Sequence, residues 1–519
     1  MITARSRGGA VRTVLLVVVA AAFAVPAGSL LVRALGDTSG TWAAITDSDV
    51  LGPLRRTVVL AVIVTTLATI VGMTMAWCCS RTDVPGRRAL RLIAVLPLVI
   101  PSFVAAHALV SAFSPGGLLE QALGWSNLPD FRGLPGAVVV LTLLTYPYVY
   151  LPVLARLSAL PPSLEESGRL LGLSPVGVFR RVVLAQIAPA VLSGALLVAL
   201  YTVSDFGAVQ FVGYDTLTRT IFAAQLDPVR SVAMSLVLAV LAIAITVSER
   251  TGRRRIPVTT TTANRRPVPV PLGGWRVPAT IGCWGLVTIA LAAPVAVMAW
   301  WVVRGRSAGA RRSQVIDLRE AGWSSAWIAV VAAVVTVAVV LPLAVAAVRH
   351  RGRAASVAGA VVTSGFALPG VVIALALVQM FVGTALYQGF AVLVASYVLH
   401  FGGQAFGPAA AAVGAVPTRF DEVARLLGAS RWRRWWRIDL RLMLPGLAAA
   451  GGLVLMSVLK ELPATLMLRP IGFDTLATRI SATVEAALLV DAGELSLVLI
   501  AVSGVLTWLL VIRRLDRLS

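Results

Sequence analysis

Lysine is nearly absent from this chain of 519 residues, since Lys460 is the single lysine among 45 basic residues. A phosphate-binding loop of the G-x-x-x-x-G-K-[ST] type needs a lysine directly before Ser or Thr. Lys460 is followed by Glu461 instead. The sequence therefore excludes a nucleotide motor of this kind, and we predict a chain that is not an enzyme and has no ATPase motif.

Cysteine and histidine are also scarce, with three of each in the chain. They are Cys78, Cys79, Cys283, His107, His350 and His400. The cysteines are too few and too apolar in their surroundings for a disulfide framework or a zinc site, and the histidines lack the spacing of metal ligands. No nucleophile, base and orienting group cluster in the sequence. We predict no catalytic residue, no metal site and no cofactor bound by this chain.

Charged residues make up only 13% of the chain, whereas 58% is hydrophobic and the mean hydropathy is +0.88. No soluble core could enclose so much apolar surface, so lipid must surround most of it. The longest uncharged run must fold back, with its turn at Gly383 to Gly389. The pattern predicts an all-α polytopic membrane protein of about twelve transmembrane helices. The uncharged runs are 13–32, 57–80, 92–119, 133–155, 182–204, 231–248, 277–303, 321–348, 354–418, 442–459 and 495–512.

The net charge of +22 follows mainly from topology. With the N-terminus inside, most arginines fall in cytoplasmic loops, as the positive-inside rule requires. The loop from Arg304 to Arg319 opposes this topology, because it places its arginines outside. The arginines are spread over many loops rather than gathered on one face, which disfavours nucleic-acid binding. We predict a multi-pass protein with both termini cytoplasmic.

The two halves of the chain repeat one another. The segment Glu166-Ser-Gly-Arg-Leu-Leu-Gly-Leu-Ser174 recurs 256 positions later as Glu422-Val-Ala-Arg-Leu-Leu-Gly-Ala-Ser430. Pro189 matches Pro445 and Asp205 matches Glu461 in the same register, and Asp-Thr-Leu at 215–217 recurs at 474–476. Six spans is an even number, so the halves are parallel repeats related by an axis along the membrane normal. We predict repeats at 1–248 and 277–519, joined by a cytoplasmic basic and Pro-rich linker at 249–276.

Each repeat carries a polar segment between two spans, at 165–181 and 421–437. A connection serving only as a turn could be much shorter. Gly172 and Gly428 are expected to end one short helix and start another at an angle, because glycine adopts positive φ at little cost. Aromatic and basic residues follow in both copies. Such an amphipathic segment suits a groove on a partner protein, and the alternative is a helix lying on lipid headgroups.

These residues resemble the EAA loop of importer-type ABC permeases, whose short helices dock into clefts of separate ATPase subunits. Glu166, Gly172, Glu422 and Gly428 occupy the motif positions, although Ser-Gly and Val-Ala replace its small residues. The resemblance implies a bacterial inner-membrane subunit with two ATP-binding cassette partners that hold the ATP. It also implies an external substrate-binding protein. The implied coupling residues are Glu165, Glu166, Arg169, Gly172, Glu422, Arg425 and Gly428.

Two further stretches are similar to the fused two-repeat permeases of ferric iron importers. One begins at Ser204-Asp-Phe-Gly-Ala-Val, and the other runs from Lys460-Glu-Leu-Pro-Ala-Thr to Asp474-Thr-Leu-Ala-Thr. This resemblance implies a type I importer fold and ferric iron as the transported substrate. Thiamine and phosphonate permeases share the fold and parts of the pattern, so these solutes stay as alternatives.

Asp205 and Glu461 end the fifth and eleventh spans at equivalent positions. An acidic group near the membrane is costly unless it has a partner or a use. The pair could line the mouth of a cation path, or each could simply pair with an arginine or with backbone amides. Ferric iron prefers oxygen ligands, and no cluster of carboxylates and tyrosines is visible in the sequence. Capture of the metal is therefore expected from the external binding protein.

Two other classes of protein compete with this interpretation. An ion-gradient-driven secondary transporter of similar size would need no ATPase, so copurification of an ATPase separates the two. A membrane enzyme is disfavoured because no catalytic cluster is visible. Prolines within the spans, at Pro97, Pro101, Pro147, Pro152, Pro342 and Pro369, suit kinked helices.

Overall fold

The computed structural model describes residues 2–124, 128–254, 270–307, 318–350, 352–365, 367–417, 419–426, 428 and 430–509. In these residues the chain forms helices throughout, and the only β-type contact described is a parallel bridge between Thr82 and Val270. The expectation of an all-α membrane protein is confirmed. Ten helices are long and apolar enough to cross a membrane, and two bent helix pairs raise the described spans to twelve.

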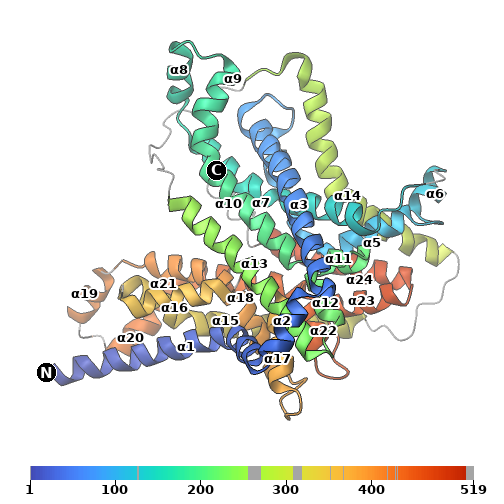
Figure 1. The fold of residues 1–519 in the computed structure, drawn as a ribbon. Coiled ribbons are helices and arrows are strands. Elements are labelled where there is room, and N and C mark those ends of the chain that lie inside the picture. Colours follow the sequence, from blue (N-terminus) through green and yellow to red (C-terminus); the bar gives the residue numbers. More distant parts are fainter. Residues whose placement is uncertain are drawn as a thin grey trace.

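The two halves repeat the same order of membrane-spanning helices, and Figure 1 shows how these helices are arranged. The first half consists of α1 (Ile2–Gly36), α2 (Thr38–Thr46), α3 (Ser48–Arg81), α4 (Arg87–Ile93), η1 (Leu96–Val99), α5 (Ser102–Phe113), α6 (Leu118–Leu123), α7 (Gly133–Ala159), α8 (Pro162–Leu170), α9 (Pro175–Val178), η2 (Phe179–Val183), α10 (Leu184–Ser204), α11 (Gly207–Val212), α12 (Leu217–Ala223) and α13 (Pro228–Arg254). After η3 (Gly273–Trp275), the second half consists of α14 (Arg276–Ser307), α15 (Leu318–Arg349), α16 (Arg353–Gly365), α17 (Gly370–Phe381), α18 (Phe390–Gly414), α19 (Arg419–Leu426), α20 (Arg431–Arg434), η4 (Trp435–Asp439), α21 (Leu440–Leu459), α22 (Pro463–Leu468), α23 (Leu476–Glu485) and α24 (Leu489–Thr507).

The third span of each half is a bent pair of helices. Arg87–Val99 and Ser102–Phe113 meet at 91°, and Arg353–Gly365 and Gly370–Phe381 meet at 100°. Pro101 and Pro369 directly precede the second member of each pair, where a proline cannot continue the helix before it. Of the predicted kinks, these two coincide with sharp bends. Pro147, Pro152 and Pro342 lie inside continuous helices.

Each bent pair crosses the membrane once. In the first half, α3 and α7 end side by side, since the Arg81 guanidinium donates to the Leu157 carbonyl at 3.0 Å. In the second half, a Cβ on Gly414 at the end of α18 would lie 3.8 Å from Val348 near the end of α15. Two parallel helices joined in sequence need a return crossing between them. The segments α4–α5 and α16–α17 make these crossings, which gives twelve.

The long run at 354–418 turns where the sequence predicts. α17 ends at Phe381 and α18 begins at Phe390. The region 277–348, where the arginine count opposed the predicted topology, also forms two separate spans, Gly273–Gly305 and Leu318–Arg349. The linker was expected at 249–276, but α13 continues to Arg254 and α14 already begins at Arg276. The residues 255–269 lie outside the described part.

The first span of each half packs on the other half. α1 lies against α16 and α17, and α14 lies against α5. Bare glycine surfaces allow this close approach: a Cβ on Gly402 would lie 2.4 Å from the Phe23 ring, and one on Gly86 would lie 2.8 Å from Trp284. Because α1 and α14 each contact helices of both halves, the two halves are packed into one unit.

The chain that enters the second half is also attached to the first half. The Val270 amide donates to the Arg81 carbonyl at 2.8 Å, and the Leu272 amide donates to Asp83 at 3.0 Å. The Trp284 indole then donates to the Pro85 carbonyl at 3.2 Å. These bonds connect the end of the linker to the turn between α3 and α4.

Candidate functional site

The two polar segments singled out in the sequence form matching loops, which we call the paired loops (residues 162–183 and 419–439). Between them the chain crosses six times, through α10, α13, α14, α15, α16–α17 and α18. An even number of crossings places both loops on the same side of the membrane. In Figure 1 they lie at the ends of two diverging arms, α8 and α9 on one and α19 and α20 on the other.

A glycine turn sets the angle inside each loop. Gly172 has a φ of +79° and Gly428 a φ of +71°, as the sequence predicts. In the first loop, the Leu173 amide donates to the Gly168 carbonyl at 3.1 Å and the Gly172 amide donates to the Arg169 carbonyl at 2.9 Å. This pair of bonds is the Schellman motif, which ends a helix at a left-handed residue. A Cβ on Gly172 or Gly428 would meet no atom within 4 Å, so backbone conformation alone selects glycine here.

The helix that follows each turn begins with a serine cap. The Ser174 hydroxyl accepts from the Gly177 amide at 3.2 Å, and the Ser430 hydroxyl accepts from the Arg433 amide at 3.3 Å. A π-helical turn then follows at equivalent positions, 179–183 and 435–439. The two loops therefore share their turn, their cap and their π-helical exit.

An arginine at the end of each second span supports the adjoining loop. Arg81, which is 2% exposed, lies 3.2 Å from Glu165 at the start of the first loop. Arg349 lies 3.3 Å from the buried Asp439 at the end of the second loop, and Arg434 lies 3.7 Å from the same carboxylate. A loop carboxylate held by a buried arginine is fixed to the transmembrane body. Arg81 and Arg349 are distant in sequence from these carboxylates, so no local sequence pattern indicates them as partners.

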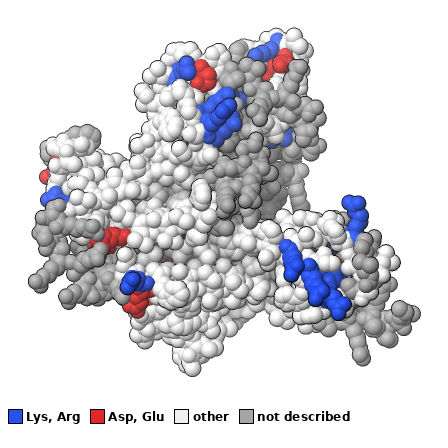
Figure 2. All heavy atoms as spheres, turned by 180° about the vertical axis from the view of Figure 1, so that it is seen from behind, with Lys and Arg blue, Asp and Glu red and all other residues white. Residues whose placement is uncertain are grey.

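The tips of the paired loops expose large apolar side chains. Leu170 and Leu171 are 88% and 83% exposed in the first loop, and Leu426 and Trp432 are 87% and 71% exposed in the second. Basic side chains surround them. Figure 2 shows Lys and Arg gathered at the ends of the two arms, with an almost uncharged belt between. Exposed basic residues of the loops are Arg169, Arg180, Arg181, Arg433 and Arg437. Exposed apolar residues ringed by charge indicate a protein-binding surface.

The predicted coupling residues differ in their positions. Glu166 and Arg169 are exposed on α8, whereas Glu165 turns inward to Arg81. The side chains of Glu422 and Arg425 lie outside the described residues, although their backbone belongs to α19. Glu165 therefore holds the loop in place, and the exposed residues are those accessible to a partner.

Asp205 and Glu461 occupy equivalent places at the far ends of α10 and α21. Asp205 accepts from the Ala208 amide at 2.8 Å, and Glu461 accepts from the Ala464 amide at 3.2 Å. Each carboxylate thus caps a short helix, α11 or α22. In the described part of the chain neither forms an ion pair. Of the two structural partners considered from the sequence, backbone amides are present, and no arginine pairs with either carboxylate among the residues that the structure describes.

A tyrosine precedes the first of these carboxylates on the same helix. Tyr201 lies on α10 four positions before Asp205, so the two residues lie on the same side of the helix. The Tyr201 ring also packs on Tyr148, with centroids 5.7 Å apart.

The single lysine also connects the halves. The Lys460 ammonium donates to the Leu98 carbonyl at 2.8 Å, at the break of the bent span of the first half. This carbonyl is accessible because the helix is interrupted there. Lys460 therefore points away from its neighbour Glu461 and across the interface.

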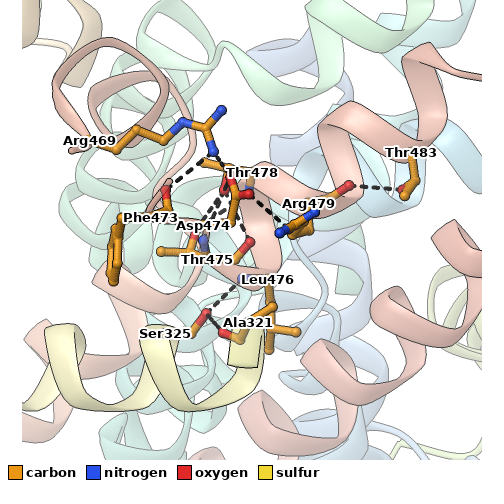
Figure 3. Close-up of polar contacts among 10 residues, drawn as sticks. All are labelled: Ala321, Ser325, Arg469, Phe473, Asp474, Thr475, Leu476, Thr478, Arg479 and Thr483. Carbon is orange, nitrogen blue, oxygen red and sulfur yellow. Dashed lines mark hydrogen bonds and ion pairs between the residues drawn. The ribbon is translucent and has the colours of Figure 1, made fainter. Parts of the chain in front are cut away.

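A cluster of arginines and an aspartate holds the repeated Asp-Thr-Leu segment of the second half. Asp474 pairs with Arg469 and with Arg479, the latter at 2.8 Å (Figure 3). Burial and the neighbouring Arg479 lower the pKa of the Arg469 guanidinium, which nevertheless stays charged at neutral pH. The Ser325 hydroxyl of α15 accepts from the Leu476 amide at 2.7 Å.

The first half contains a bond equivalent to that between the Leu476 amide and Ser325. The Thr57 hydroxyl accepts from the Leu217 amide at 2.9 Å. One crossing separates each Asp-Thr-Leu segment from a paired loop. The segments therefore lie on the side of the membrane opposite the paired loops.

Comparison with known proteins defines the class. Residues 68–249 and 338–518 match the family described as binding-protein-dependent transport system inner membrane component. The chain belongs to this family, and it is an importer permease of the ATP-binding cassette type with two copies of the family domain. Its two matches agree with the repeat found in the sequence and in the helix order.

Individual relatives differ in how much of the chain they share. The Fe(3+)-transport system permease protein FbpB 2 of Haemophilus influenzae is 29% identical over 88% of this chain and 89% of its own length. The sulfate transport system permease protein CysT of Salmonella typhimurium is 30% identical over 34% of this chain and 65% of its own length. A probable molybdenum ABC transporter permease of Haloferax volcanii is 29% identical over 39% of this chain and 74% of its own length.

Proposed function

We propose that this chain is the membrane subunit through which a binding-protein-dependent importer moves ferric iron, driven by two separate ATPase subunits. The paired loops face the cytoplasm in this proposal, as the positive-inside rule favours. Each loop docks one ATPase, and the chain itself supplies neither a nucleotide site nor a bound cofactor. An external binding protein delivers the substrate to the opposite side.

The observation that carries the proposal is the pair of equivalent loops on one side of the membrane. Both present exposed apolar side chains on a short helix whose angle is set by a glycine turn. Two such surfaces, at the ends of two arms that are otherwise interlocked, can transmit the closing movement of two ATPases. A secondary transporter driven by an ion gradient would have no need for either surface.

Ferric iron is favoured as the substrate by the extent of similarity. The relative with the Fe(3+) name aligns over nearly the whole of both chains, whereas the sulfate and molybdenum relatives align over about a third of this chain. The fused arrangement of two repeats supports the same choice. Thiamine, phosphonate and sulfate are the competing solutes that an uptake experiment has to include.

Copurification with ATPase subunits tests the coupling role. The full chain is expressed with the ATPase and binding-protein subunits of its own importer and purified in detergent. We expect the ATPases to copurify with the chain and to be lost when Leu170, Leu171 and Leu426 are changed to serine together. Serine at the exposed Val240 and Ile243, which lie on the lipid-facing part of α13, is the matched control. Retention of the ATPases by the loop variant would contradict the proposal.

Uptake in proteoliposomes tests the substrate. The assembled complex, with binding protein in the external medium and ATP inside, should take up radioactive iron and should not take up sulfate or thiamine. The signal should disappear without ATP. ATP-independent uptake that follows an imposed proton or sodium gradient would show a secondary transporter instead. Uptake of another solute with iron excluded would show that the substrate is wrong while the coupling role stands.

A further inference from the structure

The second span of each half, α3 in the first half and α15 in the second, is long enough to reach both faces of the membrane. α3 runs without a break from Ser48 to Arg81, and α15 runs from Leu318 to Arg349. At about 1.5 Å per residue, their 34 and 32 residues give lengths of about 51 and 48 Å, well beyond the ~30 Å of the hydrocarbon core. Each helix can therefore hold groups on both sides of the membrane.

The outer end of each helix is bonded to one Asp-Thr-Leu segment. We call these two segments the outer segments, and they are residues 215–217 and 474–476. The Thr57 hydroxyl of α3 accepts from the Leu217 amide at 2.9 Å, and the Ser325 hydroxyl of α15 accepts from the Leu476 amide at 2.7 Å. Figure 3 shows the second of these bonds. In both halves the bond ties the second span to the first residue of a short helix, α12 or α23.

These two joints are buried, and both hydroxyls are fully used in them. Thr57 is 1% exposed and Ser325 is 2% exposed. Each hydroxyl donates at 2.8 Å to the carbonyl four positions earlier, of Pro53 or Ala321, which leaves its lone pairs for the amide of the outer segment. An amide in the first turn of a helix has no acceptor in its own helix, and leaving it unpaired inside the protein costs free energy. The bond therefore holds the outer segment firmly to the second span.

The inner end of each helix is joined to one of the paired loops. Arg81 of α3 lies 3.2 Å from Glu165, and Arg349 of α15 lies 3.3 Å from Asp439. In both helices the arginine follows the hydroxyl residue of the outer joint by 24 positions, which corresponds to about 36 Å of helix. The same interval between the same two kinds of joint recurs in both halves, so the arrangement belongs to the repeated unit.

Close packing makes each of these helices move as a unit. α3 packs along α7, and α15 packs along α18. A Cβ on Gly72 would lie only 2.7 Å from the Tyr146 carbonyl oxygen, so the backbones of α3 and α7 approach each other closely. Packed helices slide by about 1–2 Å as whole elements, because close-packed interiors do not deform continuously. A displacement of one end of α3 or α15 is therefore felt at its other end.

We propose that α3 and α15 transmit docking of the external binding protein from the outer segments to the paired loops, with Thr57 and Ser325 as positioning residues. The side chains of Asp215 and Asp474 in the outer segments are 44% and 20% exposed, so a docking protein can reach them. A shift of an outer segment moves the joined helix, and the arginine at its inner end moves the loop that docks the ATPase. The inference rests on the proposed function, since it requires ATPases on the paired loops and a binding protein on the opposite side.

ATP hydrolysis by the assembled complex tests the outer joints. The full chain with its ATPase subunits, in lipid nanodiscs, is assayed over a range of concentrations of the iron-loaded binding protein. We expect the binding protein to raise the hydrolysis rate of the wild-type complex. Thr57→Val and Ser325→Ala should each reduce the maximal stimulation by at least about twofold. The losses should multiply in the double variant, because the joints lie in different halves and share no partner.

The concentration series separates transmission from docking. If the joints only supported the docking surface, the variants would need more binding protein but would reach the same maximal stimulation. Thr57→Ser and Ser325→Thr keep a hydroxyl and should keep the maximal stimulation. Thr66→Val and Thr336→Val are the matched controls, because these hydroxyls donate to carbonyls of α3 and α15 themselves. They should change neither the maximum nor the half-saturating concentration, and ATPase copurification should be kept in every variant.

Several outcomes would overturn this inference. They are full maximal stimulation in both Thr57→Val and Ser325→Ala, an equal loss in the two control variants, or a wild-type complex whose hydrolysis does not respond to the binding protein. In each case intact ATPase copurification would show that the coupling role stands and that only this inference fails. Loss of ATPase binding by the wild-type chain would instead contradict the proposed function itself.

Discussion

The glycine turns of the paired loops allow a graded test of how loop geometry governs ATPase binding. Gly172 and Gly428 have positive φ, and no atom lies within 4 Å of the position that a Cβ would take. Alanine at either place therefore adds only the backbone cost of a left-handed residue, about 1–2 kcal/mol. If an ATPase binds only the native turn, its affinity for that loop should fall by about 5- to 30-fold.

The assay is the equilibrium binding of purified ATPase subunits to the full chain in nanodiscs. Asparagine tolerates the left-handed conformation better than alanine, so the affinity should decrease in the order Gly, Asn, Ala at both positions. Gly472 is the matched control, because its φ of +79° equals that of Gly172, it has no atom within 4 Å, and it lies on the opposite side of the membrane. Unchanged binding by Gly172→Ala and Gly428→Ala, or an equal loss with Gly472→Ala, would refute the reasoning.

Three further predictions concern the contacts that support these segments. Changing Arg81 to Ala leaves Glu165 without its buried partner and should destabilise the first half by about 3–5 kcal/mol. The measurement is the midpoint of thermal unfolding, which should be lower in the variant. An unchanged midpoint would mean that the pair is not needed. Ser325→Ala removes the acceptor for the Leu476 amide and should lower the free energy of unfolding by about 1–3 kcal/mol. The change in unfolding midpoint is compared with that of Ser39→Ala, an exposed control. Asp474→Asn should weaken capture of the external binding protein, because its two arginine partners lose their shared anion; equal binding in a pull-down with immobilised binding protein would contradict this.

Much of the fold was predictable because membrane solvation leaves a strong signal in the sequence. An apolar run of about 20 residues must cross or fold back, so the spans, the turn near 383–389 and the parallel repeat followed directly. The bends at Pro101 and Pro369 were also predictable from proline chemistry. Pro147, Pro152 and Pro342 show the limit of that rule, since a proline within a long membrane helix can be accommodated by its neighbours.

The candidate site also has features that the sequence predicts and features that it does not. The glycine turns and their serine caps are local, because each needs only a few neighbouring residues, and the sequence predicted the turns at Gly172 and Gly428. The support that Arg81 gives to Glu165 is not local, since the two residues come from different helices. An ion pair between distant positions leaves no pattern in a single sequence, and so it was missed.

The sequence by itself determined that lipid surrounds most of the chain, in which order the spans follow, and that the loop occurs twice. Hydropathy and local turn chemistry depend on neighbouring residues alone. Only the tertiary structure decided that α1 and α14 pack on helices of the other half and that the Lys460 ammonium donates to the Leu98 carbonyl across the interface. Such contacts depend on how whole helices pack, which is set by the shapes of many side chains at once. Bare surfaces such as Gly402 beneath Phe23 are what permit that packing here.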